Sequence, residues 1–473
     1  MTDHAWTGDA CSLVDAFRKG EITPPEALEA SLAAIEASAL NAFSYVDADT
    51  ARLAAEHADV TLPFGGVPVG IKELEPVEGW PLTEASLVYA DRKATYTSTQ
   101  VHRLLGAGAV LAAQTTASEF GGINVTYTRL HGATRNPWNH DRTPGGSSGG
   151  TAAAVAGGLL PIASGGDGGG SIRIPAGFTG LFGLKANYGR IPKGPFTHQI
   201  PHTVTVGCLS RSVRDTARWF DVCNGYDPHD THSLPRVEGW EAGLGSHRHE
   251  LRGKRAVIAV DLGVAVVHPE VAALVTAGAD ALIADAGLAR VEVAVSFPPA
   301  LFEWAMSNLV TLAADLGDKY PACEPDLTPE IMLGLNIAAH HYNLGMAASA
   351  ERFRVGAHEA MADLLDEVDF IFCSTNPDVA FGAEGPIPTK VGDVDLMEKY
   401  GDIMRVGANQ GNLTFPANLS GNPAVSVPAG TFDGLPVGLQ IIGRHHQEEL
   451  LLDLALMAER ERPWPLVAPG APH

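Results

Sequence analysis

The stretch from Gly145 to Gly177, GGSSGGTAAAVAGGLLPIASGGDGGGSIRIPAG, constrains this chain more than any other part of the sequence. A serine pair flanked by glycines opens it, and Ser171 follows three consecutive glycines near its end. The small-residue segment 151–163 predicts a tightly packed helix followed by a buried strand. Each glycine costs backbone entropy on folding, so their number indicates a main chain that must approach something a Cβ atom would exclude.

The glycines before Ser171 suit the binding of a developing negative charge. Main-chain N–H groups directed at one point stabilise an oxyanion, and four consecutive residues can supply them: Gly168, Gly169, Gly170 and Ser171. Ser171 at that point predicts a nucleophile, which needs a base to take its proton. No histidine lies in the stretch. The apolar run GVPVGIKE at 66–73, which predicts a short strand, supplies a single lysine, Lys72.

Three motifs together resemble the amidase signature family, the Ser-cisSer-Lys hydrolases. They are GVPVGIKE at 66–73, TRNPWNHDRTPGGSSGG at 134–150 and GGDGGGSIRIPAG at 165–177. Further matches are GLKANYGRIP, SRSVRDTA and the segments FPANLSGNPAVSVPAG and DGLPVGLQIIGR near the end of the chain. The resemblance covers most of the chain and is weakest between about residues 230 and 400.

The resemblance implies a role for each of three side chains. Ser171 would attack a carbonyl carbon, Ser147, held by a cis peptide bond in the family, would relay the proton, and Lys72 would be the base. The N–H groups of residues 168–171 would form the oxyanion hole. Lys72 must be neutral to act as a base, so burial has to lower its pKa from about 10.4 toward 7.

Three positions depart from the usual family pattern. Glu73 follows the lysine where many members carry aspartate, and because it is also acidic we expect it to point away from the Lys72 ammonium. Gly166 stands in place of a hydroxyl residue, and Gly168 in place of threonine or isoleucine. These two glycines give the loop before Ser171 more conformational freedom.

The same resemblance implies the fold and the activity. We expect one amidase-signature domain over residues 1–473, an α/β structure with a central mixed β-sheet covered by helices on both faces. The implied activity is hydrolysis of amide-type C–N bonds through an acyl-enzyme on Ser171, with no cofactor and no metal. Esters should also be cleaved because they form the same tetrahedral intermediate, and carbamates are chemically accessible for that reason.

Hydrophobic periodicity independently predicts alternating helices and strands. We expect helices at 9–17, 25–37, 99–106, 116–121, 212–224, 268–286 and 447–460, with a largely helical region from 300 to 366. We expect strands at 67–71, 108–113, 255–260, 291–295, 368–373, 424–428 and 437–442.

Two long segments without clear periodicity, 76–98 and 376–405, are candidates for functional loops. The resemblance implies that these loops and the helices of 300–345 frame the substrate entrance. Four large side chains are candidates for an apolar, substrate-binding pocket wall, with ordinary core or surface packing as the alternative for each: Trp304, Met306, Met332 and Tyr342.

Composition excludes several classes of partner. The chain carries 55 acidic and 32 basic residues, a net charge of −23. This balance argues against a nucleic-acid-binding surface and against binding to an anionic membrane. Five scattered cysteines without CxxC spacing disfavour disulfides and a zinc site, and fit a reducing compartment. With no apparent signal peptide, we expect a cytoplasmic protein with a small-molecule amide, ester or carbamate substrate. A homodimer is compatible with the sequence.

A second interpretation of the serine pair is the nucleophile elbow of α/β-hydrolases. The segment 145–149 satisfies GxSxG, and His445 lies late enough to complete a triad. That motif needs a strand directly before it, and NPWNHDRTP does not predict one. The pairs His340–His341 and His445–His446 lack the HExxH context of a metal site and are expected to be structural.

A stronger alternative is the A subunit of glutamyl-tRNA amidotransferase, which shares the fold and the site of the family. That subunit typically reads Ser-Ile-Arg-Gln-Pro after the glycines, whereas Ile174 occupies the glutamine's position here. An apolar residue there, together with the acidic composition, favours a stand-alone hydrolase. Asp167 and Arg173 flank the nucleophile, and we expect them to tie the glycine loop together by a charge-assisted hydrogen bond.

Overall fold

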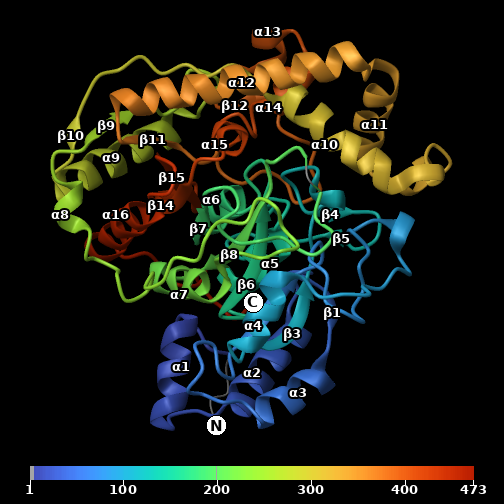
Figure 1. Cartoon of the computed structure of the whole chain (residues 1–473), viewed down its shortest axis with the longest axis vertical. Coiled ribbons are helices and arrows are strands. Elements are labelled where there is room, and N and C mark those ends of the chain that lie inside the picture. The colour runs from blue at the N-terminus through green and yellow to red at the C-terminus, as the bar shows by residue number, and fades with distance from the viewer. Residues whose placement is uncertain (1–4, 199) are drawn as a thin grey trace.

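The computed structural model describes residues 5–198 and 200–473, and one mixed sheet of 11 strands runs through it (Figure 1). The strand order is β1-β3-β2-β6-β8-β7-β14-β15-β11-β9-β10. β2 pairs in parallel with β3 and β6, β9 pairs in parallel with β10 and β11, and the other neighbours are antiparallel. The strands of this sheet are β1 Phe43–Val46, β2 Pro68–Lys72, β3 Val110–Thr115, β6 Ile162–Asp167, β7 Phe182–Lys185, β8 Thr205–Ser210, β9 Arg255–Ile258, β10 Ala289–Arg290, β11 Phe370–Ser374, β14 Ala424–Phe432 and β15 Leu435–Gly443.

Helices and two small hairpin sheets surround this sheet. The α-helices are α1 Ala10–Lys19, α2 Pro24–Ala37, α3 Ala48–Glu56, α4 Thr99–Gly106, α5 Gly149–Ala156, α6 Arg173–Thr179, α7 Val213–Cys223, α8 Arg248–Leu251, α9 Pro269–Ala286, α10 Leu301–Leu316, α11 Pro329–His341, α12 Leu344–Glu367, α13 Leu396–Tyr400, α14 Ile403–Ala408, α15 Phe415–Ser420 and α16 Glu448–Glu461. The hairpin sheets pair β4 Tyr127–Thr128 with β5 Gly132–Ala133, and β12 Lys390–Val391 with β13 Val394–Asp395. Within the described residues, no helix is both long enough and apolar enough to span a bilayer.

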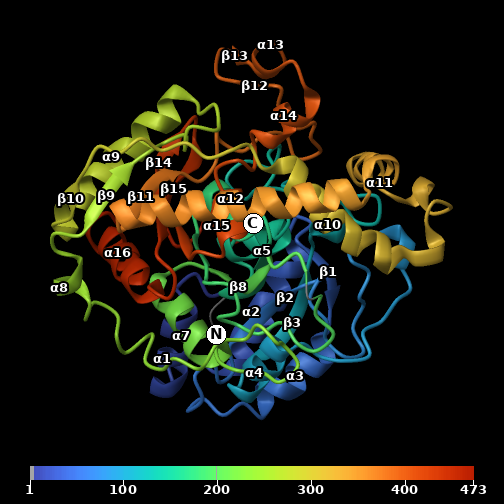
Figure 2. The same ribbon diagram turned by 45° about the horizontal axis from the view of Figure 1, so that its top comes forward.

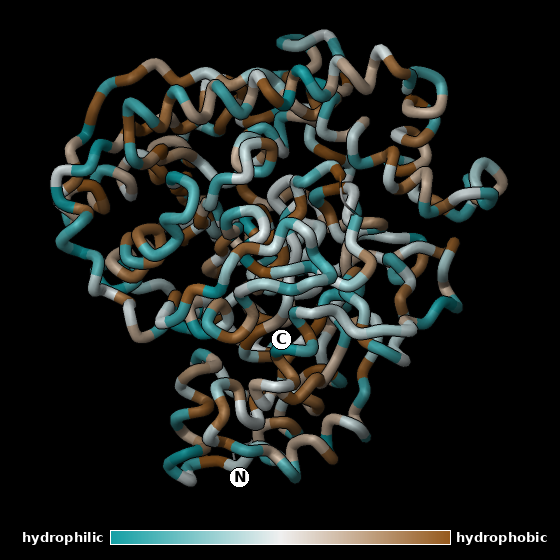
Figure 3. Tube along the Cα trace, in the orientation of Figure 1, coloured by the Kyte–Doolittle hydropathy of each residue, from teal (hydrophilic) through white to brown (hydrophobic). Residues whose placement is uncertain are grey.

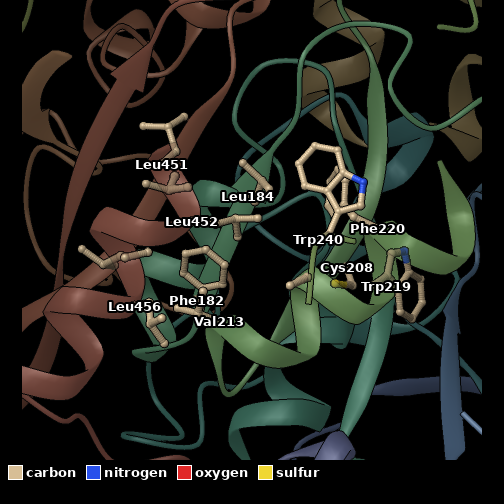
Figure 4. Close-up of a cluster of buried hydrophobic side chains, with 14 of the residues drawn as sticks. Phe182, Leu184, Cys208, Val213, Trp219, Phe220, Trp240, Leu451, Leu452 and Leu456 are labelled. Carbon is tan, nitrogen blue, oxygen red and sulfur yellow. The ribbon is translucent and has the colours of Figure 1, made fainter. Parts of the chain in front are cut away.

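One face of the sheet is covered by α1, α4, α7, α9 and α16, whose apolar side chains form the largest core cluster. Figure 4 shows part of it, where Phe182 of β7 lies between side chains of α7 and α16. Trp219 and Phe220 of α7 and Leu451 of α16 are fully buried in this layer. Burying such side chains stabilises the fold by about 1.5–3 kcal/mol each.

The opposite face carries α2, α3, α5, α6, α12 and α15. α12 is a long helix that crosses the molecule in front of α15 (Figure 2). Its trace alternates between hydrophobic and hydrophilic residues in Figure 3, as an amphipathic surface helix should. Met361, Leu364 and Leu365 from its last turns pack onto the sheet. A mixed sheet with helices on both faces is therefore confirmed.

Local capping explains why the first two helices begin where the sequence predicted. Asp9 accepts a hydrogen bond from the Ser12 N–H at 2.7 Å and caps α1. Thr23 and Glu26 form a capping box at the start of α2, which satisfies main-chain donors that the helix leaves unpaired.

Two predicted elements are wrong. Residues 116–121 form no α-helix but only the 3₁₀ turn Glu119–Gly121. Its central residue, Phe120, has a φ of 52°, which interrupts helical geometry. The strand expected at 291–295 is absent, and β10 ends at Arg290. β10 is the last strand at its edge of the sheet and pairs only with β9. The Val291 N–H still donates to Ala256 O of β9 at 2.9 Å, but the pairing does not continue over residues 292–295.

Truncating Phe182 to alanine should destabilise the protein strongly, because its side chain is fully buried between α7 and α16. We expect a loss of about 3–5 kcal/mol, seen as a lower urea midpoint with circular dichroism as the probe. Phe196→Ala is the matched control, since Phe196 is 80% exposed. Equal midpoints for the two variants would contradict this account of the core.

Candidate active site

Lys72 is the last residue of β2 and is fixed by the neighbouring strand. Its main-chain N–H donates to the Ser164 hydroxyl of β6 at 2.9 Å. The side chain is only 3% exposed. The sheet therefore holds the predicted base rigidly in a dry position.

The Lys72 amine contacts both serines of the pair. Nζ lies 2.7 Å from Ser147 Oγ and 2.9 Å from Ser148 Oγ. The peptide bond between Gly146 and Ser147 is cis, as the resemblance implied. The contact with Ser148 was not predicted, although the doubled serine in the sequence is a signal that could have suggested it.

Burial lowers the pKa of Lys72 to about 7, because the charged amine loses its hydration. The carboxylates of Asp167 and Glu73 oppose this shift without overcoming it. A substantial share of Lys72 is consequently neutral near pH 7, as a general base requires.

Glu73 is fully buried and held by other partners than Lys72. Its Oε1 accepts from the Ala117 N–H at 2.8 Å, and its Oε2 lies 2.9 Å from His131 Nε2. These contacts account for an acidic residue beside the lysine that forms no ion pair with it. His131 was not singled out in the sequence, because nothing in its local pattern connects it to residue 73.

Asp167, at the end of β6, is the centre of the glycine loop. It forms a two-point ion pair with Arg173, with Nε to Oδ2 and Nη2 to Oδ1 both at 3.0 Å. Burial alone would raise the pKa of the Asp167 carboxyl, but Arg173 and the Asn418 amide outweigh it and hold the pKa at about 2. The expected charge-assisted contact between Asp167 and Arg173 is thus confirmed.

The four proposed oxyanion donors are not equivalent. The Gly170 N–H donates to Asp167 Oδ1 at 2.8 Å and is not free to bind an oxyanion, so the prediction of four free donors is wrong for Gly170. The N–H groups of Gly168, Gly169 and Ser171 donate to no atom of the described residues. The carbonyls on this loop are fixed instead: Gly168 O accepts from Trp304 Nε1 at 2.7 Å and Gly169 O from Thr414 Oγ1 at 2.6 Å.

A cavity of about 950 Å³ lies against this loop. Ser171, Gly169, Gly146 and Ile174 line it, so the predicted nucleophile and the residue preceding Ser147 face the same space. Most of the remaining wall is apolar, with side chains such as Leu74, Phe120, Ile123, Leu309, Ile331 and Phe415.

Of the four candidates for the pocket wall, only Trp304 lines this cavity. Its ring stacks on Phe415 at a centroid distance of 5.0 Å. Met306 is 1% exposed and points into the protein from the opposite side of α10. Met332 packs within the cluster between α10 and α11. Tyr342 is 38% exposed, just past the end of α11. The helical periodicity of α10 separates Trp304 from Met306 by about 200°, which explains why Met306 does not face the cavity.

The geometry also decides against the nucleophile elbow. No strand ends directly before the serine pair in the described chain, and α5 begins only at Gly149. His445 Nδ1 lies 2.8 Å from Asn187 Oδ1, while Lys72 occupies the place beside Ser147.

Comparisons with known proteins agree with this site. The Amidase family model matches residues 26–452, so the chain belongs to the amidase signature family. The chain is 33% identical to the A subunit of the glutamyl-tRNA(Gln) amidotransferase of Roseiflexus sp. (strain RS-1), with 97% of each chain covered. It is 27% identical to a bacterial aryl acylamidase of the same family, with a TM-score of 0.88 and 98% of each chain covered. It is 28% identical to 6-aminohexanoate cyclic dimer hydrolase in complex with substrate, with a TM-score of 0.86 and 99% coverage of each.

A methyl group at position 170 should disrupt the glycine loop. Gly170 has a φ of 131°, and an added Cβ would lie 2.4 Å from Thr414 Oγ1 and 2.7 Å from Ile174 Cδ1. We expect Gly170→Ala to lower the urea midpoint by an amount equivalent to about 1–3 kcal/mol. Gly166→Ala is the control, because the nearest atom to its Cβ would be Thr205 O at 3.7 Å. A midpoint for Gly170→Ala as high as that of the control would refute the packing described.

Proposed function

We propose that this protein is a serine hydrolase that cleaves amide-type C–N bonds through an acyl-enzyme on Ser171. The observation that carries the proposal is the buried contact of the Lys72 amine with Ser147 Oγ at 2.7 Å, beside a cavity that Ser171 lines. A lysine whose pKa burial lowers to about 7, in contact with a serine hydroxyl, can serve as a general base.

In the proposed reaction, the Ser171 hydroxyl attacks the carbonyl carbon of an amide bound in the cavity. Ser147 takes the Ser171 proton as it passes its own proton to neutral Lys72. The N–H groups of Gly168, Gly169 and Ser171 supply the donors for the oxyanion. The proton returns by the same path to the leaving amine, the C–N bond breaks, and water then cleaves the acyl-enzyme with the roles reversed.

Two features favour a stand-alone amidase over an amidotransferase component. Ile174, at the position where the amidotransferase A subunit typically carries glutamine, lines the cavity. The wall beside it is mainly apolar, which suits an acyl or aryl group better than free glutamine. The amidotransferase A subunit remains the second candidate, because the relative at 33% identity carries that name. Ester and carbamate cleavage are part of the proposal for the first candidate.

The purified protein should hydrolyse an activated anilide or aryl ester with no tRNA, ATP or second subunit. Ser171→Ala should reduce kcat by at least about 10³-fold, because the acyl-enzyme cannot form. Release of 4-nitroaniline, followed by absorbance, measures this. Hydrolysis of glutamine alone, and only with partner subunits added, would favour the amidotransferase. Near-normal turnover by Ser171→Ala would remove the nucleophile assignment.

The pH dependence of kcat/KM should follow the ionisation of the Lys72 amine. Since only its neutral form accepts a proton, kcat/KM should rise with pH up to the pKa of about 7 and level off above it. At pH 5 the value should be roughly 100-fold below the plateau, since the neutral fraction falls tenfold for each pH unit below the pKa. Lys72→Arg should abolish the rise together with the activity, because arginine stays protonated. Wild-type kcat/KM at pH 7 in this variant would exclude Lys72 as the base.

A further inference from the structure

One basic side chain on the cavity wall forms no ion pair with the described residues. Lys193 follows the strand β7 and lines the same cavity as Ser171. Its main-chain N–H donates to Asp230 Oδ2 at 2.9 Å, which fixes the backbone at this point. Its side chain is half-buried.

The Lys193 ammonium rests against an aromatic side chain. Nζ lies 3.3 Å from the Tyr188 hydroxyl and 4.8 Å from the centre of the Tyr188 ring. No carboxylate of the described residues lies within 4.0 Å of it. An ammonium has three N–H donors, and the tyrosine uses one of them. Burial lowers the pKa of Lys193 to about 8, so the group stays mainly charged at pH 7.

The other charged groups on the cavity wall are of two kinds. Glu75 and Glu330 form no ion pair with the described residues either, and Glu75 accepts hydrogen bonds from Ser98 and Gln100. The remaining groups are paired. Arg92 and Glu84 form an ion pair at 3.0 Å, and His198 Nε2 lies 3.0 Å from Asp315 Oδ2.

A partly buried cation without an ion pair loses hydration. The Asp230 carboxylate, more than 4.0 Å from the ammonium, offsets that loss only in part, and burial still lowers the pKa of Lys193. A negatively charged group on a bound molecule would offset that cost.

A buried hydroxyl on the same wall also lacks a partner. Thr203 is 1% exposed and lines the cavity, and its Oγ1 forms no hydrogen bond with the described residues. Thr203 directly follows His202, whose ring packs against Tyr188 at a centroid distance of 5.6 Å. Tyr188 therefore connects the Lys193 side chain with the segment that carries Thr203.

We propose that Lys193 recognises a carboxylate carried by the substrate at a distance from the amide bond that is cleaved. One carboxylate oxygen would accept a hydrogen bond from the ammonium. This inference rests on the proposed function and narrows it to amides with one anionic end and a mainly apolar body. Lys193 acts here in specificity and takes no part in the chemistry at Ser171.

The test compares two kinds of anilide that differ in charge. One series is succinyl-, glutaryl- and adipyl-4-nitroanilide, which places the carboxylate at three distances from the scissile bond. The neutral reference is 5-methylhexanoyl-4-nitroanilide, in which an isopropyl group replaces the carboxylate of the glutaryl compound. The readout is the ratio of kcat/KM for the best acid to kcat/KM for the neutral reference.

Lys193→Met should lower this ratio by about 10- to 100-fold, mainly through a higher KM, because a hydrogen bond to a charged group is lost. Lys193→Arg, which keeps the charge, should retain most of the ratio. Lys319→Met is the control for removal of one positive charge outside the cavity. An unchanged ratio in Lys193→Met, or a wild-type preference for the neutral anilide over all three acids, would overturn the proposal.

Binding separates this inference from the proposed function. In a Ser171→Ala background, calorimetry should give a lower Kd for at least one of the three acids than for the neutral anilide. Lys193→Met should remove this difference in Kd. This result supports the carboxylate site even if no anilide is turned over by the wild type. Turnover of the neutral anilide without any difference in binding would leave the amidase proposal intact and reject the carboxylate site.

Discussion

The buried ion pair of Asp167 and Arg173 is the interaction on which the arrangement of the site depends. Both side chains are fully buried, and together they join parts of the chain that are far apart in sequence. Arg173 also donates to Gln440 of β15 and to Asn418 of α15. Breaking such a pair would leave an uncompensated charge in the core, at a typical cost of about 3–5 kcal/mol. The geometry of the glycine loop is therefore determined by its contacts with the core. Its own glycine-rich sequence would leave the loop flexible.

A second constraint is that the carboxylates around Lys72 are kept from forming an ion pair with its amine. Four carboxylates act on Lys72, and each has other partners. Asp167 pairs with Arg173 and Glu84 with Arg92. Glu73 contacts His131 and the Ala117 N–H, and Glu75 accepts from Ser98 and Gln100. Because each carboxylate has its own partners, none forms an ion pair with the amine, and dehydration dominates its pKa. A fall in the Lys72 pKa from 10.5 to about 7 means that the site destabilises the charged amine by roughly 5 kcal/mol relative to water.

The sequence predicted those parts of the structure that depend on local pattern or on long motifs. The mixed sheet, the Lys72 contact with Ser147 and the Asp167–Arg173 pair all followed from residues that the motifs contain. The strands β7 and β8 were missed. β7 has only four residues, and both strands lie between segments rich in glycine and proline, whose turn signals mask the strand pattern. The role of Gly170, the pairing of Glu73 with His131 and the orientation of Met306 depend on tertiary contacts between distant residues. No local pattern encodes those contacts, so only the folded chain could reveal them.

The order of strands has a consequence for how the chain can vary. Lys72 ends β2 and Asp167 ends β6, and these strands are parallel neighbours although they lie far apart in sequence. Both side chains therefore lie at the carboxyl ends of neighbouring strands, whatever the length of chain that connects the strands. Segments such as 76–98 can be lengthened, shortened or exchanged without moving the lysine toward or away from the loop. A slip of one residue in the pairing of β2 would instead turn Lys72 to the other face. A change in the cavity wall can therefore reshape the cavity without moving Lys72, provided that Trp304 stays, because its Nε1 holds Gly168 O of the loop.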